Sequence, residues 1–162
     1  MELLEYSYIS IKNDLLKLFL LCSLAISMGV WKEFILTVTT MSLIRVLVGG
    51  IHQESFWSCF FFSLFYISLN IVTAVLLKGY TTILFIITVV STLIPFILSP
   101  KPSNRKKALS ERQKSKRKRL CLILEIMFVI FAVVIKRPEY KACIYTSVIN
   151  SNLQLLYINR RG

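Results

Sequence analysis

Six separate apolar runs in a chain of 162 residues constrain this protein more than any other sequence feature. The runs cover residues 15–31, 34–48, 56–77, 81–99, 120–135 and 142–158. A helix that crosses a bilayer needs about 20 mostly apolar residues, so the chain has room for about six spans at most. Hydrophobic residues make up 56% and charged residues 17% of the sequence, which is typical of a membrane protein rather than of a soluble domain. We therefore predict a single all-α, polytopic domain over residues 1–162, embedded in the cell membrane.

Positive charge is concentrated between the fourth and fifth runs. Ten of the twenty Lys and Arg residues lie in 101–119, opposed only by Glu111, in a chain of net charge +12. Because basic loops stay on the cytoplasmic side, we predict a basic cytoplasmic loop at 100–119 that contacts anionic lipid headgroups. The charge is not spread over a polar surface, and no soluble domain presents it. The pattern therefore disfavours nucleic acid as a partner.

The number of spans is open between six and four. Counting six spans outward from the basic loop places both termini and residues 49–55 on the cytoplasmic side, although the basic residues at 136–141 then lie outside. In the four-span alternative, residues 34–55 are re-entrant or only partly inserted. The last run is the weakest span because its polar side chains need partners, and it is either a bundle-interior helix or a surface helix. Residues 1–14 form either an interfacial amphipathic helix or an extension of the first span.

The four cysteines and the single histidine do not form a metal-ligand pattern. Cys22, Cys59, Cys121 and Cys143 are far apart, with no Cys-x-x-Cys pair, so the sequence predicts neither a zinc site nor a disulfide framework. We expect no metal and no organic cofactor. The N-terminus lacks the basic start and the small-residue cleavage site of a secretory signal, so we take Met1 as the start of the protein.

The segment between the second and third runs holds the residues that could carry chemistry. His52 is the sole histidine, and Cys59 follows it by seven residues. A cysteine attacks as the thiolate and needs a base or a positive environment, which makes His52 the candidate base. On one ideal helix the two would lie about 10.5 Å apart along the axis. Gly49 and Gly50 therefore matter, because a glycine pair lets the chain leave the helix and fold His52 back toward Cys59 in a polar catalytic turn.

Arg45 and the neighbours of His52 complete this hypothesis. An Arg inside an apolar run is costly, so Arg45 is predicted to bind a substrate carboxylate, support an oxyanion or pair with Glu54. Its ordinary alternative is to mark the cytoplasmic end of a span. Glu54, Gln53 or Ser55 could orient the imidazole, and the sequence does not choose among them. Taken singly, the histidine is an interfacial anchor, the glycines a turn and the cysteine a small apolar residue.

The order of these residues is similar to that of a known family. Arg45, Gly49-Gly50, His52 and Cys59, followed by Ser99-Pro100-Lys101-Pro102-Ser103-Asn104 and a basic loop, resemble the AgrB family, the accessory gene regulator B-like peptidases of Gram-positive bacteria. The resemblance covers nearly the whole chain in length and hydropathy order, and its specific part lies in residues 45–59 and, more weakly, in 99–119. Gln53 departs from the family, in which a small residue is frequent after the histidine.

The resemblance implies a membrane cysteine endopeptidase with Cys59 as the nucleophile and His52 as the general base. Family members remove the C-terminal tail of an AgrD-like propeptide and support its cyclisation to a thiolactone or lactone quorum-sensing peptide. Their precursors carry an amphipathic N-terminal helix and an acidic tail, which suits a bilayer-bound enzyme with a basic cytoplasmic loop. Assembly as a homodimer is compatible with polar helix faces that need partners. The alternative is a non-enzymatic small membrane transporter, exporter or adaptor, which composition and span pattern fit equally well.

Overall fold

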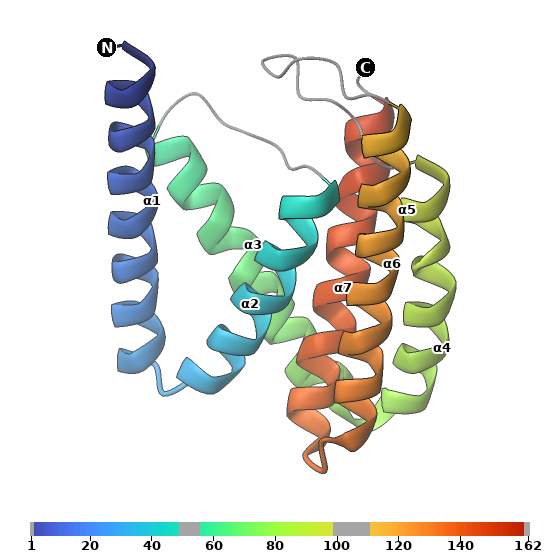
Figure 1. The fold of residues 1–162 in the computed structure, drawn as a ribbon. Coiled ribbons are helices and arrows are strands. Elements are labelled where there is room, and N and C mark those ends of the chain that lie inside the picture. Colours follow the sequence, from blue (N-terminus) through green and yellow to red (C-terminus); the bar gives the residue numbers. More distant parts are fainter. Residues whose placement is uncertain (1, 49–55, 99–110, 161–162) are drawn as a thin grey trace.

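The computed structural model describes residues 2–48, 56–98 and 111–160, and in these ranges it is all-helical, with no strand. In chain order the helices are α1 (Glu2–Ser27), α2 (Trp31–Val48), α3 (Phe56–Leu77), the short 3₁₀ helix η1 (Lys78–Tyr80), α4 (Thr81–Ser91), α5 (Leu93–Leu98), α6 (Glu111–Val134) and α7 (Pro138–Arg160). Each predicted apolar run corresponds to one or two of these helices (Figure 1). The all-α prediction is therefore confirmed, and the number of membrane spans stays a prediction.

The first helix is uninterrupted and ends at a glycine. Residues 2–14 continue directly into the first apolar run, which favours an extended first helix over a separate amphipathic one. Gly29 follows the helix with a φ of +72°, a left-handed conformation that glycine adopts without strain. Across it the Val30 N–H donates to the Ala25 carbonyl (3.0 Å), as in a glycine-capped helix end. The turn sends α2 back along α1, where Ala25 lies in one apolar cluster with Phe34.

The helix at the centre of the bundle is α7, the run that the sequence marked as the weakest span. Helices α2, α3, α4, α5 and α6 all pack on it (Figure 1). Residues 142–148 are buried without interruption. The bundle-interior alternative for this run is therefore confirmed, and the surface alternative is wrong.

The polar side chains of α7 are tolerated in the interior because other helices offer them partners. Asn70 of α3 is fully buried and donates from Nδ2 to Thr37 Oγ1 of α2 (3.0 Å) and to Ser147 Oγ of α7 (2.8 Å). Its Oδ1 accepts a hydrogen bond from Asn150 Nδ2 of α7 (2.8 Å). One amide thus joins three helices, and we call Asn70, Thr37, Ser147 and Asn150 the Asn70 cluster.

The fourth run is broken into α4 and α5 between Ser91 and Leu93. Pro95 has no N–H to donate to the Ser91 carbonyl four residues before it, so that acceptor is left free by the helix. Asn152 of α7 occupies it instead, with Nδ2 lying 3.0 Å from the Ser91 carbonyl oxygen and 3.3 Å from its Oγ. The break in one helix is therefore stabilised by a polar side chain of the central one.

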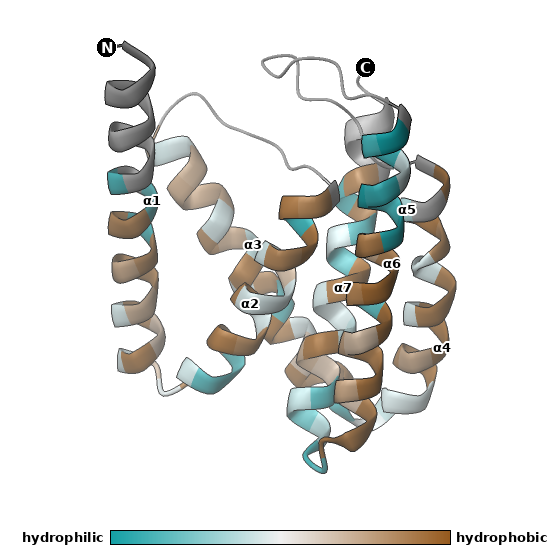
Figure 2. Ribbon diagram, viewed as in Figure 1, coloured by the Kyte–Doolittle hydropathy of each residue, from teal (hydrophilic) through white to brown (hydrophobic). Residues whose placement is uncertain are grey.

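Many large apolar side chains are exposed on the outside of the bundle. Figure 2 shows that hydrophobic residues make up much of the helices. Phe61, Phe65, Val90 and Phe131, for example, are each more than half exposed. Within the described part of the chain, residues 56–95 are the one helical stretch that is long and apolar enough to cross a bilayer. It turns at η1, so that α3 and α4 form two limbs (Figure 1). An apolar exterior of this extent is suited to contact with lipid rather than with water.

The basic segment reaches into α6. Residues 99–110 lie outside the described part of the chain, whereas residues 111–119 form the first turns of that helix. These turns are the strongly hydrophilic end of α6 in Figure 2. Residues 111–119 of the predicted basic loop are therefore helical. Helix α6 continues from them without a break into the fifth apolar run.

Candidate active site around Cys59

The structure describes two of the six candidate residues between the second and third runs. These two are Arg45 in α2 and Cys59 in α3. Gly49, Gly50, His52 and Glu54 lie outside the described residues, together with Gln53 and Ser55. The pairing of His52 with Cys59, the glycine turn and a contact of Arg45 with Glu54 therefore remain predictions.

Cys59 lies in the first turn of α3 and is half-buried. The positive end of a helix dipole lies at this end of the helix, which favours a negative charge there. Aromatic rings surround the turn: the Trp57 ring centroid lies 6.3 Å from those of both Phe60 and Phe61, and 5.3 Å from that of Phe56. The thiol thus lies in an apolar setting that still leaves it partly accessible.

Lys17 of α1 faces this turn. Its Nζ lies 5.3 Å from the centroid of the Phe56 ring and within electrostatic range of the Cys59 thiol. The same nitrogen donates to Asp14 Oδ1 (3.1 Å), three residues earlier in α1. The sequence analysis did not select Lys17, although it is the one charged residue in the run 15–31, and that isolation was the available signal.

Arg45 approaches the same region from α2. Its Nε and Nη2 both donate to Gln154 Oε1 of α7, with a distance of 3.1 Å for Nε. The guanidinium lies within electrostatic range of Cys59 and of the Tyr66 hydroxyl, both in α3. Gln154 was not among the partners considered for Arg45 from the sequence. The contact fixes the guanidinium on the side of α2 that faces α7 and α3.

The other three cysteines have different surroundings. Cys121 and Cys143 are fully buried in α6 and α7, and Cys121 donates to Glu125 Oε1 (3.7 Å). Cys22 packs against the apolar cluster that joins α1, α2 and α3. Of the four thiols, Cys59 is therefore the one within electrostatic range of both Lys17 and Arg45. In the described ranges, no group of three or more His, Cys, Asp or Glu side chains is placed to bind a metal.

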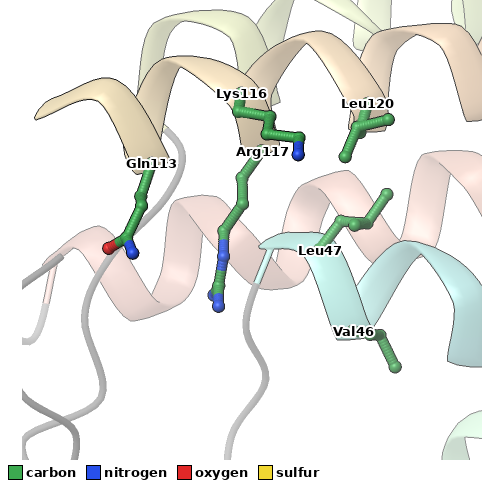
Figure 3. A pocket seen from close by; sticks show the side chains of 6 residues that line it. All are labelled: Val46, Leu47, Gln113, Lys116, Arg117 and Leu120. Carbon is green, nitrogen blue, oxygen red and sulfur yellow. The ribbon is translucent and has the colours of Figure 1, made fainter. Parts of the chain in front are cut away.

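A hollow of about 310 Å³ opens between α2 and the basic end of α6 (Figure 3). Val46 and Leu47 of α2 form one side of it, and Lys116 and Arg117 project from α6 on the other. Gln113 and Leu120 complete its lining. The hollow adjoins the end of α2, from which the sequence continues into residues 49–55, so cationic side chains lie near that end of the helix.

The apolar helical bundle, together with a half-buried thiol within electrostatic range of two cations, defines a helical, membrane-type protein with a candidate cysteine site. Residues 1–158 match the family AgrB, accessory gene regulator B, and the chain belongs to this family. It is also similar to a putative AgrB-like protein of Clostridium beijerinckii, with 24% identity over 160 residues, covering 98% of this chain and 78% of the relative. No solved structure matches the chain. These matches confirm the resemblance seen in the sequence. The family is membrane-associated and processes quorum-sensing propeptides.

Proposed function

We propose that this protein is a multi-pass membrane cysteine endopeptidase that removes the C-terminal tail of an AgrD-like propeptide and supports cyclisation of the remaining peptide. One observation carries the proposal: Cys59 is half-buried at the start of α3, with the cations of Lys17 and Arg45 within electrostatic range. This position directly follows the segment that contains His52. Family membership supplies the class of substrate.

In the first step, His52 accepts the proton of the Cys59 thiol and the thiolate attacks the carbonyl carbon of the scissile bond. The new S–C bond forms, the C–N bond breaks, and the imidazolium returns its proton to the amine of the departing tail. The N-terminal end of α3 and the neighbouring cations stabilise the thiolate that makes the attack. The core peptide remains on Cys59 as an acyl thioester.

In the second step, a Cys or Ser side chain of the peptide attacks this thioester and closes the ring. The acyl group moves to the peptide side chain, and Cys59 recovers its proton as the thiol. Exchange of one thioester for another is close to isoenergetic, whereas hydrolysis is downhill, so exclusion of water favours the ring. The rings of Phe56, Trp57 and Phe60 supply apolar surroundings for this purpose.

The basic hollow beside α2 is suited to the acidic tail of the precursor. Lys116 and Arg117 offer positive charge, and Val46 and Leu47 offer apolar contact next to the chain that leads to His52. Figure 1 also draws the start of α1, the start of α3, the start of α6 and the end of α7 at one end of the bundle. This arrangement supports the six-span scheme, in which the termini, the active site and the basic segment share the cytoplasmic side.

Single-turnover processing of an AgrD-like precursor in liposomes tests the proposal. Cys59→Ala and His52→Ala should each reduce cleavage by at least about a thousandfold, as removal of a nucleophile or its base does in other peptidases. A triple Cys22/Cys121/Cys143→Ala variant is the matched control and should cleave like the wild type. Mass spectrometry should place a covalent peptide adduct on Cys59.

Equal cleavage by all of these variants would contradict the proposal. The segment 45–59 would then be a turn between helices with an anchoring histidine. In that case the non-enzymatic transporter or adaptor alternative would replace the peptidase.

A further inference from the structure

Lys17 is placed differently from a lysine that anchors a helix at a membrane surface. An anchoring lysine extends its ammonium into water or headgroups, so its side chain stays exposed. The Lys17 side chain is only 13% exposed, whereas that of Asp14, one turn away, is 70% exposed. The leucines on either side, Leu16 and Leu18, point outward. The charge of Lys17 is therefore turned inward, against the face of α3.

The face of α3 that Lys17 meets contains the thiol. Phe56 and Cys59 are three residues apart in one helix, so their side chains lie on neighbouring positions of one face. Lys17 Nζ lies over the Phe56 ring, 5.3 Å from its centroid. The ammonium thus lies over the aromatic ring and within electrostatic range of the sulfur. It also donates a hydrogen bond to Asp14 Oδ1 (3.1 Å), one turn earlier in α1.

From this geometry we propose that Lys17 is a catalytic residue whose ammonium donates a hydrogen bond to the Cys59 sulfur and stabilises the thiolate. The inference rests on the proposed function, because it assigns the residue that supports its nucleophile. When His52 removes the thiol proton, the negative charge on sulfur forms next to the positive charge of Lys17. Lys17 keeps all its protons throughout, and the charge on sulfur disappears as the S–C bond forms.

The reactivity of Cys59 toward iodoacetamide measures this role without any precursor. The experiment uses the full chain in lipid vesicles, with Cys22, Cys121 and Cys143 replaced by Ala, so that Cys59 is the single thiol. Lys17→Gln should slow alkylation at pH 7 by about tenfold, because the thiolate is the reacting form. Lys17→Arg keeps the charge and should stay within about threefold of the parent rate.

Lys78→Gln is the matched control. Lys78 also pairs with a carboxylate, Glu139 (3.6 Å), but it lies at the opposite end of α3 and its side chain is 50% exposed. It should leave alkylation of Cys59 unchanged. The emission of Trp57, which lies in the same turn as Cys59, reports whether each variant keeps the start of α3 folded, provided that Trp31 is replaced by Phe throughout.

The outcomes separate this inference from the proposed function. Slower alkylation and proportionally slower single-turnover cleavage in Lys17→Gln support both. Unchanged alkylation in a folded Lys17→Gln variant overturns the role of Lys17, whatever Cys59→Ala does to cleavage. If Lys17→Gln slows alkylation but Cys59→Ala cleaves the precursor fully, the peptidase proposal is overturned. The effect of Lys17 on the reactivity of Cys59 would then stand without a role in cleavage.

Discussion

Two polar regions of this bundle are built in opposite ways. In the Asn70 cluster, side chains of α2, α3 and α7 donate to and accept from one another in a buried interior. Near Cys59, cations from α1 and α2 lie within electrostatic range of a half-buried thiol. A buried polar group is costly unless it is paired, so the interior tolerates satisfied amides and hydroxyls. The charged groups lie instead near the start of α3, where the proposed reaction needs them.

The largest effect on stability is expected from the Asn70 cluster. Asn70→Leu should lower the free energy of unfolding by about 3 kcal/mol, because it leaves the polar groups of Thr37, Ser147 and Asn150 without their shared partner. Unfolding by sodium dodecyl sulfate in mixed micelles, followed by tryptophan emission, measures this change. Thr92→Val is the control, since the Thr92 hydroxyl bonds within its own helix turn to the Val89 carbonyl. If both variants lost equal stability, the cluster would not hold the three helices together.

Arg45 links the central helix to the surroundings of Cys59. Its guanidinium donates to Gln154 of α7 and lies within electrostatic range of the Cys59 thiol. A double-mutant cycle with Arg45→Gln and Gln154→Leu should give a coupling energy of about 2 kcal/mol in unfolding, since the pair is a charge-assisted contact of two groups on different helices. Arg45→Lys should keep the charge but lose the forked geometry, and so recover only part of the loss. Strictly additive effects of the two substitutions would show that α7 does not position Arg45.

A smaller and salt-dependent effect is expected at the basic hollow. Replacing Lys116 and Arg117 by Glu should raise KM for an acidic-tailed precursor by about tenfold at low salt and leave kcat nearly unchanged, because in the proposed function the hollow binds the tail but takes no part in the reaction. The difference should shrink as salt is added. Lys136 and Arg137, in the connection between α6 and α7, provide the matched charge reversal and should leave KM unchanged. An equal rise in KM from both pairs would show that overall charge, rather than the hollow, attracts the precursor.

The sequence predicted the helices well because their signals are local. The run 56–77 has the same bounds as α3, since polar and glycine-containing segments border it on both sides. The role of α7 stayed open because its polar side chains are explained only by distant partners. Ser147, for instance, is buried because Asn70, 77 positions earlier, donates to it. Periodicity in one segment carries no information about such a partner.

At the candidate site, the sequence predicted Cys59 but missed Lys17 and Gln154. Cys59 stood out because few residue types can act as nucleophiles, and it lies close in the sequence to the sole histidine. Lys17 escaped notice because its significance depends on how α1 packs on α3, and nothing in residues 15–31 reveals that contact. Gln154 escaped for the same reason, since α2 and α7 are separated by most of the chain.

Glu125 of α6 is a buried carboxyl group. Its charge state decides whether it resembles the paired interior or the charged surroundings of Cys59. It is fully buried, its Oε1 accepts from Cys121 Sγ (3.7 Å), and the Asn152 amide lies beside it. Among the described residues, Glu125 Oε2 and Asn152 Oδ1 are both buried without a hydrogen-bond partner. Two acceptors cannot bond to each other, but a protonated carboxyl would donate from Oε2 to Asn152 Oδ1 and satisfy both atoms. On this argument Glu125 is neutral and structural, like the members of the Asn70 cluster.

Glu125→Gln should therefore be the mildest of these substitutions. Its side-chain amide can donate to Asn152 Oδ1 and accept from Cys121 in the same shape, so the free energy of unfolding should change by less than about 0.5 kcal/mol. Glu125→Leu removes the donor and should cost about 2 kcal/mol, because Asn152 Oδ1 is then buried without a partner. The same unfolding measurement compares the two. A loss from Gln as large as that from Leu would mean that the native group carries a negative charge, which would place Glu125 with the charged residues around Cys59 and not with the paired interior.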